Sequence, residues 1–268
     1  MHEILEHLHR NARVLDLGCR DGSFPAGDYG FLTVRVDLNR PSAAAGVFVQ
    51  ADAVHLPFRS RAFDAIILNH GLEHFVHLKP ALQEIGRVLK REGAAFVSVP
   101  DARTVTDRIY RKLFRSAGGH VNLFDSPAEL GKMLAWYLGL PHVATRTLYS
   151  SLSFLNRRNT RDRRVRAQMR FPGLVEPVVM LLCAGTRLID RFLGMRTGVY
   201  GWAFYFGRIA ETIDVLPRTN VCIRCGQAHP SQSLEEAGRV RGWLFKTYCC
   251  SDCGAVNFFS LDRLEQPR

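Results

Sequence analysis

A glycine-containing loop near the start of the chain is followed by an acid at an informative distance. Residues 14–17 form an apolar run that leads into Gly18 and Gly22. Asp37 closes a second apolar run, twenty-one residues after Asp16. A glycine turn lets a ligand approach the backbone closely, and an acid about twenty residues further on is where a doubly wound sheet holds the hydroxyls of a ribose. The pattern predicts an adenosine-type cofactor in the first half of the chain.

The spacing of the glycines favours one class of cofactor. The dinucleotide fingerprint requires G-x-G-x-x-G, whereas this loop reads D-x-G-C-x-x-G with Arg20 in the middle. Further motifs follow in order: V-D at Val36, D-A-x-x-L-P-F from Asp52, F-D at Phe63, L-E-H from Leu72 and E-x-x-R-V-L from Glu84. This ordered series, over roughly residues 12 to 102, resembles a small family of class I S-adenosylmethionine-dependent methyltransferases, the type 11-like family.

The resemblance implies a fold and a cofactor site. The fold would be a Rossmann-like, doubly wound α/β sheet of seven strands, mostly parallel, with the last strand antiparallel. Arg20 replaces a glycine of the family loop, so it could crowd the methionine end of the cofactor or pair with its carboxylate. The implied cofactor-binding residues run from the methionine end through the ribose to the adenine: Asp16, Gly18, Gly22, Asp37, Leu38, Asp52, Ala53 and Asn69.

Three histidines are candidates for a catalytic base. Methyl transfer is an in-line displacement, and a hydroxyl nucleophile benefits from a base that titrates near neutral pH. His70 and His74 follow the fourth predicted strand, and His120 lies in a later glycine-containing segment. His74 could instead be a packing or capping residue, and Glu73 could either orient a neighbour or act on the substrate. The absence of [DN]-P-P-[YF] after this strand counts against amino-base and amide methylation.

Apolar runs alternate with helical patterns, which predicts a parallel sheet with crossover helices. Helices are expected at 78–89 and at 128–138, the second with Ser126 as N-cap and Gly139 at its end. The segment after Gly22 is poor in helix formers, so the first helix should be short. The predicted strands are 13–17, 32–37, 47–50, 63–68, 94–99, 142–150 and 199–206.

A basic insertion interrupts the predicted domain of residues 1–212 between its last two strands, at about 151–198. Between Arg157 and Arg170 there are seven arginines and one acid, Asp162. An anionic partner, either RNA or a membrane surface, competes here with a plain solvated surface. Residues 174–193 have the pattern of an amphipathic helix, which is expected to pack on the domain rather than to dock on a membrane.

Two C-x-x-C-G sequences near the C-terminus predict a metal site. Cys222 with Cys225 and Cys250 with Cys253 are separated by 24 residues, an arrangement that resembles a zinc ribbon over 218–262. Four thiolates can surround a structural zinc ion tetrahedrally. Cys249 could replace Cys250 as a ligand. Disulfides are the competing interpretation, which a reducing compartment disfavours.

Composition sets the outer limits of these predictions. The 268 residues are 47% hydrophobic, which is ample for a core, and carry a net charge of +11. No signal peptide or membrane span is recognised, so a cytoplasmic protein is expected. The sequence favours a methyltransferase acting on a small molecule. The alternatives are an RNA-directed methyltransferase that uses the insertion and the ribbon, and a degenerate cofactor domain that acts as a binding protein.

Overall fold

The structure of the protein is a computed structural model in which most of the chain is described. It forms two compact units. The first comprises Met1–Pro100, Phe114–Thr145 and Trp202–Val215, and the second comprises Asp101–Leu113, Arg146–Gly201 and Leu216–Arg268. The described residues are 1–19, 22–24, 26–41, 46–104, 120–149, 181–182, 185–186, 188–190, 192–195, 197–208, 220–222, 227–243, 246–252 and 254–259.

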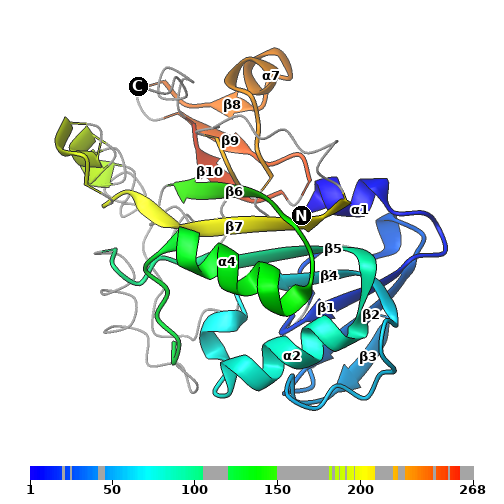
Figure 1. The fold of residues 1–268 in the computed structure, drawn as a ribbon. Coiled ribbons are helices and arrows are strands. Elements are labelled where there is room, and N and C mark those ends of the chain that lie inside the picture. The colour runs from blue at the N-terminus through cyan, green and yellow to red at the C-terminus, as the bar shows by residue number, and fades with distance from the viewer. Residues whose placement is uncertain are drawn as a thin grey trace. The chain divides into compact units, whose positions relative to one another are not determined.

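A seven-stranded sheet organises the first part of the chain (Figure 1). Its order is β3-β2-β1-β4-β5-β7-β6, and β1 to β5 pair in parallel. Strand β7 runs antiparallel, because its start lies beside the end of β5 (Asp101 N to Tyr200 O, 2.9 Å) and its end lies beside the start of β6 (Gly207 N to Pro141 O, 3.0 Å). This confirms the predicted fold class. The strands are β1 Arg13–Leu17, β2 Leu32–Asp37, β3 Val47–Gln50, β4 Phe63–Asn69, β5 Leu89–Pro100, β6 His142–Tyr149 and β7 Val199–Gly207.

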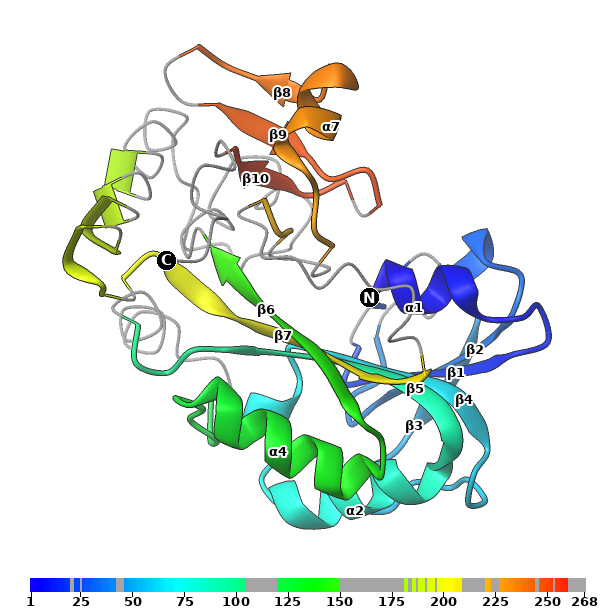
Figure 2. The ribbon, with the colours of Figure 1, turned by 45° about the horizontal axis from the view of Figure 1, so that its top comes forward.

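Helices cover both faces of this sheet (Figure 2). Helices α2 (Leu78–Val88) and α4 (Pro127–Leu138) lie side by side on one face, and α1 (His2–His7) lies on the other. As predicted, the Ser126 side chain caps α4 by accepting a hydrogen bond from Glu129 N, and Gly139 ends the helix in the left-handed conformation. Only a short 3-10 turn, η1 (Ala26–Asp28), follows the first loop, as the weak helix propensity there predicted.

Strand β5 begins earlier than the sequence predicted. Helix α2 ends at Val88, and Leu89, which was expected in the helix, already pairs with Phe63 of β4. The polar residues before Gly93 resemble a turn, yet they extend the strand through a register irregularity between Phe63 and Ala65. Lys90 Nζ donates to Asp64 Oδ1 of β4 at 2.6 Å, so the neighbouring strand stabilises the polar start of β5.

The motif residues Glu84 and Arg87 of α2 clamp the loop that follows β3. Glu84 accepts hydrogen bonds from Arg87 and from Leu56 N, and the bond from Arg87 lowers the pKa of Glu84 below its ordinary value. Arg87 also donates to the carbonyls of Leu56 and Phe58. The L-P-F and E-x-x-R motifs are therefore two halves of one contact, which fixes the position of the loop that carries Asp52.

The C-terminal residues form a small antiparallel sheet of order β10-β9-β8. Leu234, Tyr248 and Phe259 are buried together as its core. Its elements are α7 Ser231–Glu236, β8 Val240–Arg241, β9 Thr247–Cys249 and β10 Val256–Phe258.

Only part of the predicted insertion is described. The arginines from Arg157 to Arg170 lie outside the described residues, as does the first part of the predicted amphipathic helix. The described residues between 181 and 193 are helical, and large apolar side chains such as Leu181 and Phe192 are exposed there. Within the described part of the chain, no helix combines the length and the apolar character that crossing a bilayer requires.

Candidate functional site

Four neighbouring parallel strands bring the predicted cofactor residues to one edge of the sheet. Gly18 directly follows β1, Asp37 ends β2, and Asn69 ends β4. Asp52 comes two residues after β3, and Ala51 N donates to Asp37 O at 3.2 Å, which joins the ends of β2 and β3. The carboxyl edge of parallel strands is where open α/β sheets bind their ligands.

Asp16 is a fully buried carboxylate at the end of β1. Its Oδ2 accepts a hydrogen bond from Ser23 N at 2.9 Å and lies 3.8 Å from Arg35 Nε. Burial raises the pKa of Asp16 from its ordinary 3.8 to about 6, although Ser23 and Arg35 both act to lower it. A buried carboxylate with a raised pKa is typical of a binding or catalytic site. Arg35 was not predicted as a site residue, because its only signal in the sequence is a cation in the middle of an apolar run.

The raised pKa of Asp16 predicts a pH dependence of stability. Because the folded pKa lies above the unfolded one, the contribution of Asp16 is fully present below pH 3.8 and is lost as the pH rises through about 6. We expect the unfolding free energy of the natural chain to fall by about 2 kcal/mol relative to Asp16→Asn between pH 4.5 and 7.5. Urea unfolding of both proteins at the two pH values measures this difference. A constant difference would contradict the assigned titration.

The two loop glycines adopt conformations that disfavour other residues. Gly18 has φ +66° and Gly22 has φ +112°. A Cβ on Gly22 would lie 2.6 Å from a guanidinium nitrogen of Arg35, which itself donates to Phe24 O at 3.0 Å. The loop therefore closes on Arg35 only because residue 22 lacks a side chain. Arg20, whose effect on the loop the sequence left open, lies outside the described residues.

The acids after β2 and β3 stabilise their own turns. Asp37 Oδ1 accepts from Asn39 N at 3.0 Å, and Asp52 Oδ1 accepts from Val54 N at 3.1 Å. These bonds fix both carboxylates at the sheet edge. Leu38, beside Asp37, exposes 62% of its surface, whereas Ala53 is buried. A solvent-exposed apolar side chain at this edge is suited to contact the face of a flat ligand.

Asn69 and His70 end β4 in a constrained geometry. Asn69 Oδ1 accepts a hydrogen bond from Ser98 Oγ at 2.6 Å, and His70 N donates to Ser98 O at 3.1 Å. His70 adopts φ +54°, a left-handed conformation that is uncommon for a residue other than glycine. Such strained residues concentrate at functional sites. Ser98 of β5 thus fixes Asn69 at the end of β4. The sequence around Ser98 did not indicate this role.

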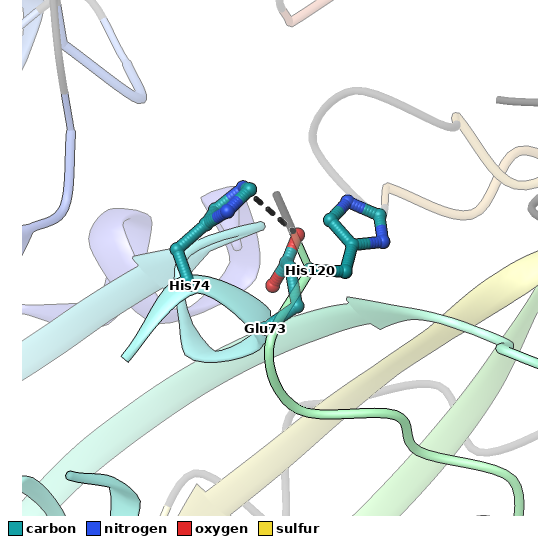
Figure 3. Close-up of side chains that lie close together, drawn as sticks. All are labelled: Glu73, His74 and His120. Carbon is teal, nitrogen blue, oxygen red and sulfur yellow. Dashed lines mark ion pairs between the residues drawn. The ribbon is translucent and has the colours of Figure 1, made fainter. Parts of the chain in front are cut away.

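Two of the three candidate histidines lie together, and Glu73 lies between them (Figure 3). His74 Nε2 lies 4.0 Å from Glu73 Oε1, and the His74 and His120 ring centroids are 5.1 Å apart. Glu73 and His74 belong to the 3-10 turn η2 (Leu72–His74), which follows β4. Metal-ligating atoms of Glu73, His74 and His120 all lie within 4.8 Å of one another, a group that His70 does not join.

A second group of potential ligands surrounds the described cysteines of the C-terminal sheet. Cys222 and Cys250 are buried, and Asn257 Nδ2 donates to Cys222 Sγ at 3.4 Å. His229 Nε2 lies 3.3 Å from Cys250 Sγ. Burial lowers the pKa of His229, but its contact with Cys250 and the charges nearby raise it overall. Sequence analysis did not identify His229 or Asn257.

The arrangement distinguishes the two adjacent thiols that the sequence left as alternatives. Cys249 is half-buried at the end of β9 and its Sγ donates to Gly254 O at 3.4 Å. Cys250 is buried, and its carbonyl accepts from Gly254 N at 3.1 Å in the tight turn that a C-x-x-C-G knuckle requires. Cys225 and Cys253, the other two predicted ligands, lie outside the described residues.

Comparison with known proteins places these residues in a family context. A demethylmenaquinone methyltransferase of Thermotoga maritima is 38% identical over 68 residues, 24% of this chain and 30% of that protein. An uncharacterized protein of Methanocaldococcus jannaschii is 36% identical over 90 residues, 32% of this chain and 40% of that protein. The chain thus spans less than half the length of these two relatives.

The fold has a counterpart among solved structures. A SAM-dependent methyltransferase from Archaeoglobus fulgidus superimposes with a TM-score of 0.50 over 73% of this chain and 86% of that one, at 19% identity. At this identity the likeness concerns the fold alone. The family model described as a methyltransferase domain matches residues 1–139, which span β1 to β5 and the carboxyl edge of these strands. Since this match covers just over half of the 268 residues, the chain belongs to the methyltransferase-domain family.

Proposed function

We propose that the protein is an S-adenosylmethionine-dependent methyltransferase with a small-molecule acceptor. The observation that carries this proposal is the buried Asp16, which lies beside a glycine loop at the carboxyl edge of the sheet, with Asp37 at the end of the next strand. The cofactor supplies an activated sulfonium methyl group, so the protein has mainly to position an acceptor against it.

The residues at the edge fit the cofactor chemically. S-adenosylmethionine carries an ammonium group at its methionine end, and a cation there would favour the ionised form of Asp16, whose pKa is about 6 without one. Gly18 would let the backbone approach the same end of the ligand, and Gly22 would shape the loop there by closing on Arg35. Asp37 would accept from the ribose hydroxyls, with Leu38 beside them. Asp52 and Ala53 would contact the adenine, and Asn69 would face the reacting side.

The acceptor side is expected around the end of β4. His70, His74 and His120 remain the candidates for a base, and His74 with His120 form one group in the structure. The Thermotoga maritima relative is named for demethylmenaquinone, a small molecule and not a macromolecule. This name supports a small-molecule acceptor here.

We also propose that Cys222, Cys225, Cys250 and Cys253 bind a structural zinc ion. The two described ligands fit this role, because both sulfurs are buried and each lies beside a side-chain nitrogen, of Asn257 or His229. Such neighbours orient metal ligands and stabilise thiolates. A four-thiolate site is closed, so the ion would stabilise the module and would not take part in methyl transfer.

Calorimetric titration of the full chain tests the proposed enzyme. We expect one S-adenosylmethionine or S-adenosylhomocysteine to bind per chain, and the affinity for S-adenosylmethionine to increase as the pH rises through about 6, because ionised Asp16 favours the ammonium group. The Asp16→Asn variant should lose this pH dependence. No heat of binding with either ligand, from a chain that melts cooperatively, would refute the proposal.

A further inference from the structure

Glu73, His74 and His120 present two imidazoles and a carboxylate to one point (Figure 3). Their ligand atoms all lie within 4.8 Å of one another. Two histidines and one carboxylate form the donor set of three-ligand sites for zinc or iron(II), in which a further position stays open. We propose that these three residues bind a divalent transition-metal ion, a site separate from the C-terminal cysteines.

The ligand atoms of Glu73 and His74 lie close to the separation that a shared ion requires. The contact between Glu73 Oε1 and His74 Nε2 spans 4.0 Å, which is longer than a hydrogen bond. In a tetrahedral site, two donors at about 2.1 Å from the ion lie about 3.4 Å apart, so a closure of about half an ångström brings both onto one ion.

The backbone holds the third ligand near the first two. Glu73 O accepts hydrogen bonds from Val121 N at 2.8 Å and from Asn122 N at 3.1 Å. The Asn122 side-chain amide donates to two more carbonyls of the same turn, at 3.0 and 2.6 Å. These bonds fix the residues that follow His120 against the turn that carries Glu73 and His74. Ligands on a fixed support need little rearrangement when the ion arrives.

The site is accessible from one side. The His74 side chain is 41% exposed, so the ring has space to move the short distance that coordination requires. Three protein ligands leave a position for water or for an oxygen of another molecule. A histidine that coordinates an ion cannot act as a base, so with the ion bound His70 is the candidate base of the three. The next step alone rests on the proposed methyltransferase function. A bound ion lowers the pKa of a hydroxyl group, so the open position favours an acceptor with an oxygen nucleophile.

Manganese(II) is the probe that separates this site from the cysteines, because it prefers nitrogen and oxygen donors to thiolates. The full chain, loaded with a single equivalent of zinc, which the four thiolates take first, is titrated with Mn²⁺, and free Mn²⁺ is followed by electron paramagnetic resonance. We expect one bound Mn²⁺ per chain. Glu73→Gln and His120→Ala should each weaken this binding at least about tenfold. The exposed His77, three residues after His74, provides the control His77→Ala, which should leave the binding unchanged.

Two results would overturn the metal site: no Mn²⁺ bound by the natural chain, or equal Mn²⁺ affinity in the natural chain and in both variants. Thermal melting of each variant confirms that it is folded, and His120→Ala retains the test if Glu73→Gln does not fold. Titration of the same samples with S-adenosylmethionine separates the two proposals. A chain that binds S-adenosylmethionine but no Mn²⁺ refutes the metal site alone, and the reverse result refutes the proposed function alone.

Discussion

Replacing Asp37 with alanine should weaken the binding of S-adenosylmethionine at least about 100-fold. The carboxylate ends β2, where its Oδ1 already accepts from Asn39 N and its position is fixed at the sheet edge. We expect it to accept two hydrogen bonds from the ribose. Hydrogen bonds with a charged partner are worth about 1.5–3 kcal/mol each, and 1.4 kcal/mol corresponds to a tenfold change in affinity. Calorimetric titration of the variant measures the loss.

Glu92→Ala is the matched control for this variant. Glu92 is an exposed acid near the amino-terminal end of β5, at the opposite edge of the sheet, where it pairs with Arg208 at 3.4 Å. Its removal changes the net charge as Asp37→Ala does and should leave the affinity unaltered. Equal affinity in the natural chain and in a folded Asp37→Ala variant would show that the ribose is not held at this position.

Local patterns were sufficient to predict most of the sheet. Apolar runs that end in an acid, a glycine or an asparagine, such as β1, β2 and β4, have clear boundaries, and the structure places them within one residue of the prediction. The predicted start of β5 was wrong because the polar residues Lys90 and Glu92 resemble those of a turn. Their strand conformation depends on pairing with β4, including the contact between Lys90 and Asp64, which no local pattern reveals.

The placement of the candidate site residues could be predicted where a motif spans them, but not where a residue distant in sequence packs beside them. Asp16, Asp37 and Asp52 have a recognisable spacing, and the structure brings the ends of their strands to one edge. Arg35 and Asn122 are isolated polar residues in unremarkable contexts. They acquire their roles only when the chain folds and places them beside Asp16 and beside the turn with Glu73.

Cys250→Ser should abolish zinc binding by the C-terminal module, whereas Cys249→Ser should not. The two thiols are adjacent in sequence, so the pair is a matched test of one ligand position. Cys250 Sγ is buried beside His229 in the knuckle turn, whereas Cys249 Sγ donates to a backbone carbonyl. Metal analysis of the natural chain, purified without added zinc, should find one zinc ion per chain, and the same should hold for Cys249→Ser.

Removal of this zinc by a chelator should unfold the module but leave S-adenosylmethionine binding largely unchanged. The small core of Leu234, Tyr248 and Phe259 cannot offset the conformational entropy of the segment alone, so metal binding should supply much of its folding free energy. The strands that carry the proposed cofactor residues pack in a different core. Hydrogen exchange should therefore become fast for residues 220–259 and remain slow in β1, β4 and β5. Slow exchange in both regions after complete removal of the metal would show that the module folds without zinc, and a disulfide between its cysteines in the purified chain would replace the zinc site altogether.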